Sequence, residues 1–242
     1  MQVISQLVKY HFRQYFKTNK FVMPFTALII VLYTLYSSKP VGVVPSMVSC
    51  CIAVFLISSW TGVTVCSLED PVSEQVIILR IKSHRKYYLS HTLFLLSLST
   101  LAALISVSVP VLLNIINKGE LFERTLMVSD ILCGFLLLTL SAFMGCCLGE
   151  TAHPRIIKDR KAAVLLVFLI DIISMIKTSL LAGFPMSKII LWAFPPITRL
   201  PLAFSQDSYF SVQKVLSSAA VIFLYSVMLA AVKIFYLARQ KF

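Results

Sequence analysis

The sequence predicts an all-α integral membrane protein with six transmembrane helices, and three observations lead to this expectation. Of the 242 residues, 58% are hydrophobic and only 13% are charged, which is more apolar surface than a soluble domain can bury. The apolar residues fall into six runs, each close to the roughly 20 residues that cross a hydrocarbon core. The charged residues collect between these runs. Residues 1–242 are therefore expected to form a single transmembrane domain.

The six expected spans follow the apolar runs along the chain. They cover residues 21–37, 43–67, 92–115, 127–149, 162–183 and 213–236. Residues 186–205 form a shorter apolar stretch with too many prolines and interruptions to cross alone, so a re-entrant-like outer segment is expected there. Gly145 and Gly149 form a GxxxG motif at the end of the fourth span, which we interpret as close helix packing within the bundle.

The lysines and arginines predict the orientation of these spans. Fifteen of the 22 lie on one side, in the N-terminal segment, the 68–91 loop, the 150–161 loop and towards the C-terminus. Six lie on the other side, and Lys177 lies within a span. Positive charge favours the cytoplasmic side, so we expect a multi-pass protein of the plasma membrane with both termini in the cytoplasm. Because the basic residues sit at span ends, the net charge of +12 does not indicate nucleic-acid binding.

Residues 1–20 are expected to form an amphipathic helix that lies in the cytoplasmic interface before the first span. Apolar residues recur there at roughly helical spacing, and Lys9, Arg13 and Lys17 form a basic stripe. A plain juxtamembrane anchor would fit the same spacing. The segment is charged to its end and has no apolar core before a cleavage site, so no cleavable signal peptide is expected.

The segment at residues 68–91 is the longest charged stretch between two spans and is expected to contain a helix at about 69–86. Acidic residues at its start and basic residues near its end suit the dipole of a helix. The residues are Glu69, Asp70 and Glu74 at the start, Val76, Ile77, Ile78, Leu79 and Ile81 in an apolar stripe, and Arg80, Lys82 and Arg85 near the end. Such a helix fits either docking onto a partner protein or a solvated loop helix whose stripe rests on lipid.

Motifs of catalysis and nucleotide binding are missing from the sequence. It contains no GxxxxGK[ST] loop, no HExxH and no GxSxG. The four histidines lie in the basic segments, and none is expected to pair with an intramembrane carboxylate. The six cysteines are interpreted as small packing residues of the spans, not as metal ligands or disulfides. We therefore expect no enzyme activity, no metal and no cofactor in this chain.

Asp171 and Lys177 are the clearest ionisable residues inside a span, and charge at that depth indicates function by default. They are six residues apart, so they lie on different faces of a helix and are not expected to pair. Lys177 is close enough to the outer end to reach the interface. For Asp171 we expect a structural or gating role with a neighbouring span, and a proton-coupled carrier is the alternative.

This layout resembles the membrane subunits of type-two ABC exporters over nearly the whole chain. The N-terminal interface helix, the six spans and the cytoplasmic termini are similar, and so are two segments. In the loop, the acidic start Glu69-Asp70 precedes the helical stripe Glu74–Leu79, and a turn of a small residue and basic residues, Ser83–Leu89, then leads into the next span, as in the coupling helix of that family. The stretch Leu191–Pro201, with Trp192, Pro195, Pro196 and Arg199, looks like the family's outer segment. Pro71-Val72-Ser73 and Ile81-Lys82 depart from the family's usual Gly-Thr and Pro.

The resemblance implies a permease subunit of an ATP-driven exporter. Two copies of a separate cytoplasmic ATPase would bind ATP and Mg²⁺, and a second permease subunit, the same or homologous, would complete the transporter in the lipid bilayer. The residues implied in coupling to the ATPase are Glu69, Asp70, Glu74, Gln75, Ile78, Arg80, Ile81 and Arg85. The cargo would be amphipathic or hydrophobic: a small peptide, an antibiotic or a lipid-like molecule, with antimicrobial-peptide export or immunity as the favoured case. A membrane scaffold or assembly protein without transport is the alternative.

Overall fold

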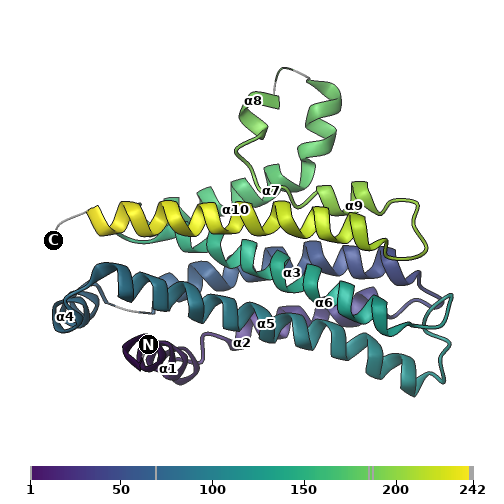
Figure 1. Cartoon of the computed structure of the whole chain (residues 1–242), viewed down its shortest axis with the longest axis horizontal. Coiled ribbons are helices and arrows are strands. Elements are labelled where there is room, and N and C mark those ends of the chain that lie inside the picture. Colours follow the sequence, from purple (N-terminus) through teal and green to yellow (C-terminus); the bar gives the residue numbers. More distant parts are fainter. Residues whose placement is uncertain (1, 69, 185, 187, 240–242) are drawn as a thin grey trace.

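The computed structural model describes residues 2–68, 70–184, 186 and 188–239, and these form helices joined by short connections (Figure 1). In chain order the helices are α1 Gln2–Lys17, α2 Val22–Leu35, α3 Val43–Cys66, α4 Pro71–Ile81, α5 His84–Ile116, α6 Val128–Gly149, the 3-10 helix η1 Glu150–Ala152, α7 Arg160–Gly183, α8 Lys188–Leu191, α9 Arg199–Ala203 and α10 Val212–Arg239. The described residues contain no strand, and an isolated bridge joins Val41 to Phe122. The predicted all-α class is therefore confirmed.

Five of the described helices are long and apolar enough to cross a membrane, namely α3, α5, α6, α7 and α10. A sixth is obtained if α1 and α2 count as one broken span, because the pair bends by 78°. Within the expected first span at 21–37 lies α2, which has 14 residues and by itself is not among these five helices. At 1.5 Å per residue it extends about 21 Å, less than the roughly 30 Å of a hydrocarbon core.

The two ends of the bundle differ in what they contain. Both termini, α1 and α4 lie at one end, together with the 150–160 segment that joins α6 to α7 (Figure 1). We name this the basic end, because it carries most of the lysines and arginines. The opposite end is made of the connections at 36–42, 117–127 and 204–211. α1 lies across the basic end at a steep angle to α2.

The closest helix pair is α3 with α6, and glycines make the close approach possible. A Cβ added at Gly149 would lie 2.0 Å from the carbonyl oxygen of Ser59, and one at Gly145 would lie 2.2 Å from that of Phe55. From the other side, a Cβ at Gly62 would lie 2.4 Å from the carbonyl oxygen of Cys146. The GxxxG motif therefore packs within the bundle, as predicted from the sequence.

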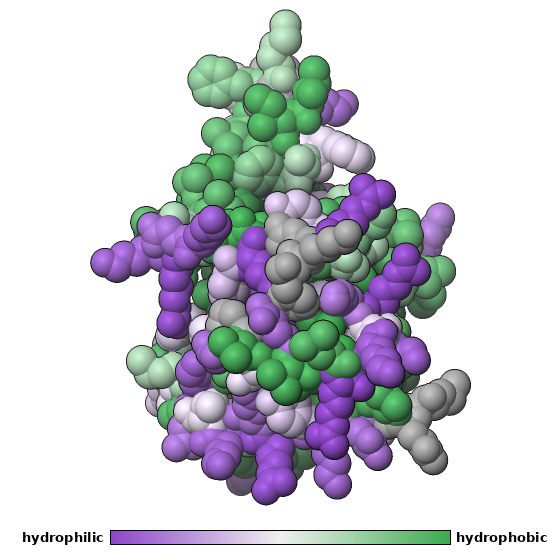
Figure 2. All heavy atoms as spheres, turned by 90° about the vertical axis from the view of Figure 1, so that its left-hand side faces the viewer, coloured by the Kyte–Doolittle hydropathy of each residue, from purple (hydrophilic) through white to green (hydrophobic). Residues whose placement is uncertain are grey.

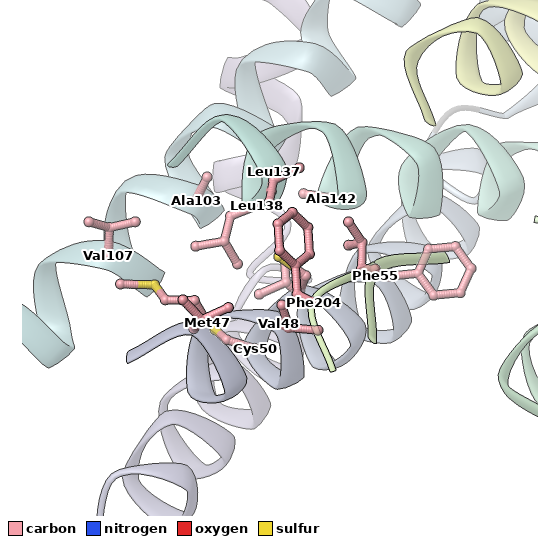
Figure 3. Packing of buried hydrophobic residues seen from close by; sticks show 14 of the residues in the cluster. Met47, Val48, Cys50, Phe55, Ala103, Val107, Leu137, Leu138, Ala142 and Phe204 are labelled. Atoms are coloured by element: carbon pink, nitrogen blue, oxygen red, sulfur yellow. The ribbon is translucent and has the colours of Figure 1, made fainter. Parts of the chain in front are cut away.

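The main hydrophobic core forms around this pair. Side chains of α3, α5 and α6 meet there, and Phe204, which follows α9, covers them (Figure 3). Phe55 and Leu138 are fully buried, and Met47 is nearly so. This core holds α3, α5 and α6 as one rigid group, to which α2 and α10 are added.

The segment from α7 to α9 is packed far more loosely. Figure 1 shows α8 and the last part of α7 standing away from the other helices. The short α8 and α9 are separated by irregular chain, so the described residues at 186 and 188–205 form no continuous span, as expected. Trp192, which follows α8, is 79% exposed.

Candidate functional site: a buried ionic network behind α4

The helix expected at 69–86 is two helices, which corrects the sequence prediction. α4 begins at Pro71, a residue whose fixed φ suits the first turn, and ends before Lys82. Lys82 adopts the left-handed conformation, with φ 54°, and turns the chain. Ser83 is extended, and its hydroxyl accepts a hydrogen bond from the Lys86 backbone N–H at 3.4 Å, so it caps the start of α5. Arg85 consequently belongs to α5.

The two faces of α4 have opposite character. Glu74 and Ile78 point into the protein and are only 4% and 2% exposed. Val72, Val76 and Leu79 point outward and are 64%, 59% and 70% exposed. Their spacing of four and three residues places them on one stripe of the helix. Figure 2 faces the basic end and shows an apolar patch among hydrophilic side chains where α4 lies in Figure 1.

Apolar contacts hold the inner face of α4 against two long helices. Ile78 packs in a buried cluster with Tyr87 and Tyr88 of α5 and Leu237 of α10. Ile156 of the 150–160 segment lies against the same cluster. A movement of α4 would therefore displace side chains of α5 and α10 directly, because close-packed groups leave no room for independent motion.

Glu74 holds α4 in place through one half of a buried network of polar and charged side chains, which we call the ionic network. The Tyr88 hydroxyl donates to Glu74 Oε1 at 2.8 Å, and Arg155 Nη1 donates to the Tyr88 oxygen at 3.0 Å. Arg155 Nη2 lies 3.5 Å and His153 Nε2 lies 3.8 Å from Glu74 Oε2. Burial, and then the nearby charges of Lys233 and His91, lower the pKa of His153 to about 3. His153 is therefore neutral at ordinary pH, and Arg155 is the cation that faces Glu74.

Glu150 forms the second half, deeper in the bundle. It follows α6 directly and is 0% exposed, and its Oε1 contacts both His91 Nδ1 of α5 and Lys233 Nζ of α10. Lys233 is only 3% exposed. Its Nζ also lies 6.0 Å from the centre of the Tyr88 ring, which joins this half to the Glu74 half. Buried charges are costly unless they are paired, so these groups fix α5, α6 and α10 relative to one another.

Sequence reasoning missed most of this site. The expectation that no histidine pairs with a carboxylate of the spans is wrong, because His91 contacts Glu150. Lys233 was expected to be one of the flanking charges, yet it is buried. A signal was present in the sequence: Lys233 stands between Val232 and Ile234 within an apolar run, where an ionisable residue usually has a partner.

α1 packs beside the network and is tied to the chain that enters α4. His11 is buried, with its Nε2 3.3 Å from the Ser90 hydroxyl and its ring centre 5.1 Å from that of His91. The amide of Gln14 donates to the Leu68 carbonyl at 3.1 Å, and Lys20 Nζ donates to that of Ser67 at 2.8 Å. The N-terminal helix thus rests on the bundle by an aromatic and polar inner face.

The other residues expected to couple to an ATPase lie on or beside α4 but outside the network. Asp70, Arg80 and Arg85 are exposed, Gln75 and Ile81 are half-buried, and Glu69 lies outside the described residues. Their role in coupling stays a prediction. The structure brings Glu74 and Ile78 into the network, behind the helix and away from its outer surface.

Asp171 and Lys177 lie apart from the network. The Ser59 hydroxyl of α3 donates to Asp171 Oδ2 at 2.8 Å, so Asp171 has a partner on a neighbouring span and none in Lys177, as expected. Lys177 Nζ donates to the Phe194 carbonyl at 3.0 Å and thereby holds the outer segment.

The outer segment is also tied to the last span. The hydroxyl of Tyr225 on α10 donates to the Ala193 carbonyl at 2.6 Å. Of the residues singled out there, Pro195 is buried and Pro196 half-buried, whereas Trp192 and Arg199 are exposed. None of the four lies with α4.

Comparisons with known proteins do not assign the chain to a family. No family model matches the chain, and no curated protein or solved structure matches it. Among the residues that the structure describes, no group of three or more His, Cys, Asp and Glu side chains is arranged to hold a metal ion. What the site can do is therefore judged from its contacts. It links one surface helix to three long helices.

Proposed function

We propose that this chain is the membrane-spanning subunit of an ATP-driven exporter, energised by a separate ATPase that contacts α4. The observation that carries the proposal is the division of α4 into two faces. Its outer stripe of Val72, Val76 and Leu79 offers apolar surface to a partner, while Glu74 and Ile78 bind the helix to the bundle. A chain without a nucleotide-binding loop needs such a contact to receive energy from ATP.

The network supports a mechanical route from α4 to the spans. A push on α4 reaches α5 through Tyr88 and α10 through Leu237. Glu150 then relates α5 and α10 to the end of α6 through His91 and Lys233. Rigid-body movement of these helices would alternate the access of a cavity shared with a second permease subunit, the same or homologous. In this proposal the basic end faces the cytoplasm of a plasma-membrane protein, and two ATPase copies bind ATP and Mg²⁺.

An apolar groove supports an amphipathic or hydrophobic cargo. It has a volume of about 230 Å³ and lies between α2, α3 and α5, with Tyr15 and Phe16 of α1 at one side. Its lining is almost wholly apolar and includes Leu28 and Ile105. A small antimicrobial peptide, an antibiotic or a lipid-like molecule has surface that such a groove accepts.

The proposal is tested by co-expressing the tagged full chain with the ABC ATPase encoded nearest to its gene. We expect the two to purify together with ATPase activity, and Leu79→Asp to lower the activity of the complex at least tenfold. A charge in the apolar stripe would have to be desolvated at the contact. Ser73→Asp is the control, because it adds the same charge to an exposed position on the flank of α4. A folded chain that binds no ATPase would contradict the proposal.

A proton-coupled carrier is the second candidate, and the burial of Asp171 favours it. Asp171 is 5% exposed, and its Oδ1 has no hydrogen-bond partner. The carrier would be favoured over the exporter if transport does not depend on ATP and is abolished by Asp171→Asn. If cargo is not moved under either condition, the chain is a scaffold or assembly protein.

A further inference from the structure

A second groove, distinct from the apolar groove described above, lies at the basic end between the start of α5 and the last turns of α10. It has a volume of about 690 Å³ and is separate from the ionic network. Its polar side is formed by Ser83, His84, Arg85 and Arg239, and its apolar side by Ala231, Ile234, Phe235 and Ala238. The proposed function assigns no role to this groove.

The position of the groove follows from the length of its two helices. α5 has 33 residues and α10 has 28, so they extend about 50 Å and 42 Å at 1.5 Å per residue. Both exceed the roughly 30 Å hydrocarbon core, so their ends reach the headgroup layer. The groove therefore opens where lipid headgroups lie, and its apolar side continues into a membrane-spanning helix.

The charge of the groove selects the kind of lipid. Arg85 and Arg239 are both exposed, and none of the described residues that line the groove is acidic. Lys82 and Lys86, on either side of the capping Ser83, are exposed as well. Arginine matches the oxygens of a phosphate in geometry and in charge, and basic pockets between membrane helices are suited to acidic headgroups.

The apolar side distinguishes a lipid from a soluble anion. Arg239 lies over the ring of Phe235, with its Cζ 4.0 Å from the ring centre, so the charge is held next to apolar surface. Phe235 itself lines the groove and is 59% exposed. An anion alone would leave this surface uncovered.

We propose that an acidic phospholipid binds in this groove, with its phosphate at Arg85 and Arg239 and an acyl chain along Ala231 and Ile234. The site requires only that α5 and α10 cross a membrane, so it does not rest on the proposed export function. An acidic lipid at this position would sit beside the turn between α4 and α5 and would stabilise it.

Native mass spectrometry of the full purified chain tests the site by titration with phosphatidylglycerol and, separately, with phosphatidylcholine. We expect tighter binding of phosphatidylglycerol. Arg85→Gln with Arg239→Gln should weaken it by more than tenfold, since each basic residue near the headgroup contributes roughly fivefold. Arg13→Gln with Lys17→Gln is the matched control, because it removes the same charge from exposed positions of α1 at the same end. Equal weakening by both double variants would overturn the site in favour of diffuse surface attraction.

Two further experiments distinguish a phosphate that belongs to a lipid from a free phosphate ion. Inorganic phosphate at millimolar concentration should not displace the lipid, and displacement would assign the groove to a soluble anion. Ala238→Trp fills the apolar side of the groove without changing its charge and should also weaken the binding of phosphatidylglycerol. Unchanged binding would contradict the contact with the acyl chain. Helix content measured by circular dichroism verifies that each variant is folded. No ATPase is present in these assays, so their outcome is independent of the test of export.

Discussion

α6 and α7 are both long and apolar enough to cross a membrane, with similar mean hydropathy, yet 67% of the most apolar stretch of α6 is buried in the protein and only 17% of that of α7. The difference lies in the side chains. α6 presents Gly145 and Gly149 to α3, which lets the two backbones meet. α7 exposes Leu165, Phe168 and Leu169. Hydropathy thus marks both helices as candidate spans, whereas small residues decide which of them belongs to the rigid part of the bundle.

The buried carboxylates of the two regions differ in the same way. Glu150, at the end of α6, contacts the two potential cations His91 and Lys233. Asp171, within α7, accepts one hydrogen bond from Ser59. The first carboxylate connects three helices at the end where α4 lies, and the second attaches one loosely packed helix. In the proposed mechanism, Glu150 therefore belongs to the route from α4 to the long helices, and Asp171 does not.

Neutralising each carboxylate in turn should give the largest difference in the free energy of unfolding between the two regions. Glu150→Gln leaves Lys233 buried without its counter-charge and should lower the free energy of unfolding by about 3–5 kcal/mol. Asp171→Asn keeps an acceptor for Ser59 and should change it by less than about 1 kcal/mol. Unfolding of the detergent-solubilised chain by denaturing detergent measures both. Equal losses would mean that Glu150 has no special place in the bundle.

Replacing one glycine of each helix with alanine should test the difference in packing between α6 and α7. At Gly149 the new Cβ would lie 2.0 Å from a backbone oxygen of α3, so the helices must separate, at a cost of about 3 kcal/mol. At Gly183, the last residue of α7, the new Cβ would meet no atom within 4 Å. Gly183→Ala should therefore leave the thermal unfolding temperature unchanged or slightly raise it, while Gly149→Ala lowers it by several degrees. A tolerated Gly149→Ala would contradict the close packing of α3 and α6.

The sequence predicts the packed spans well and the ionic network poorly. The expected span at 127–149 differs from α6 by one residue at its start, because polar residues stop the apolar run at both ends. The expected helix at about 69–86 runs past the break at Lys82 and Ser83, because a left-handed lysine leaves no mark in hydropathy or charge, and only the family resemblance implies a turn at Ser83–Lys86. The network joins residues 74, 88, 91, 150, 155 and 233. Only the packing of α5, α6 and α10 brings positions so distant in sequence together.

A smaller effect is expected for the hydroxyl that joins α4 to α5. Tyr88→Phe removes the hydrogen bond to Glu74 and the acceptor of Arg155, and it should cost about 2 kcal/mol. The loss should concentrate in α4, whose amide hydrogens would exchange faster with solvent. Tyr33→Phe on α2 is the control, because that side chain is 72% exposed. If both variants exchange alike in α4, the Tyr88 contact does not hold the helix.

The smallest expected effect is a pH dependence from His153. The pKa of His153 is lowered to about 3 in the folded chain and is about 6.5 in the unfolded chain. Below about pH 6.5, unfolding therefore takes up a proton at His153. This contribution is absent above about pH 7 and destabilises the chain as the pH falls below about 6.5. His153→Gln should remove about 1 kcal/mol of the stability lost between about pH 6.5 and 5.5. Identical pH profiles of the variant and the natural chain would show that His153 does not titrate in this way.

The central claim is that the network makes α4 and the basic ends of α5, α6 and α10 one mechanical unit. Hydrogen exchange followed by mass spectrometry, on the full chain in lipid nanodiscs, tests it most directly through Glu150→Gln. Glu74, not Glu150, forms the polar contacts that hold α4, so any effect on α4 has to pass through the network. We predict faster exchange in α4, in the basic end of α5 and in the last turns of α10 together. Faster exchange around Glu150 with unchanged exchange in α4 would contradict the claim.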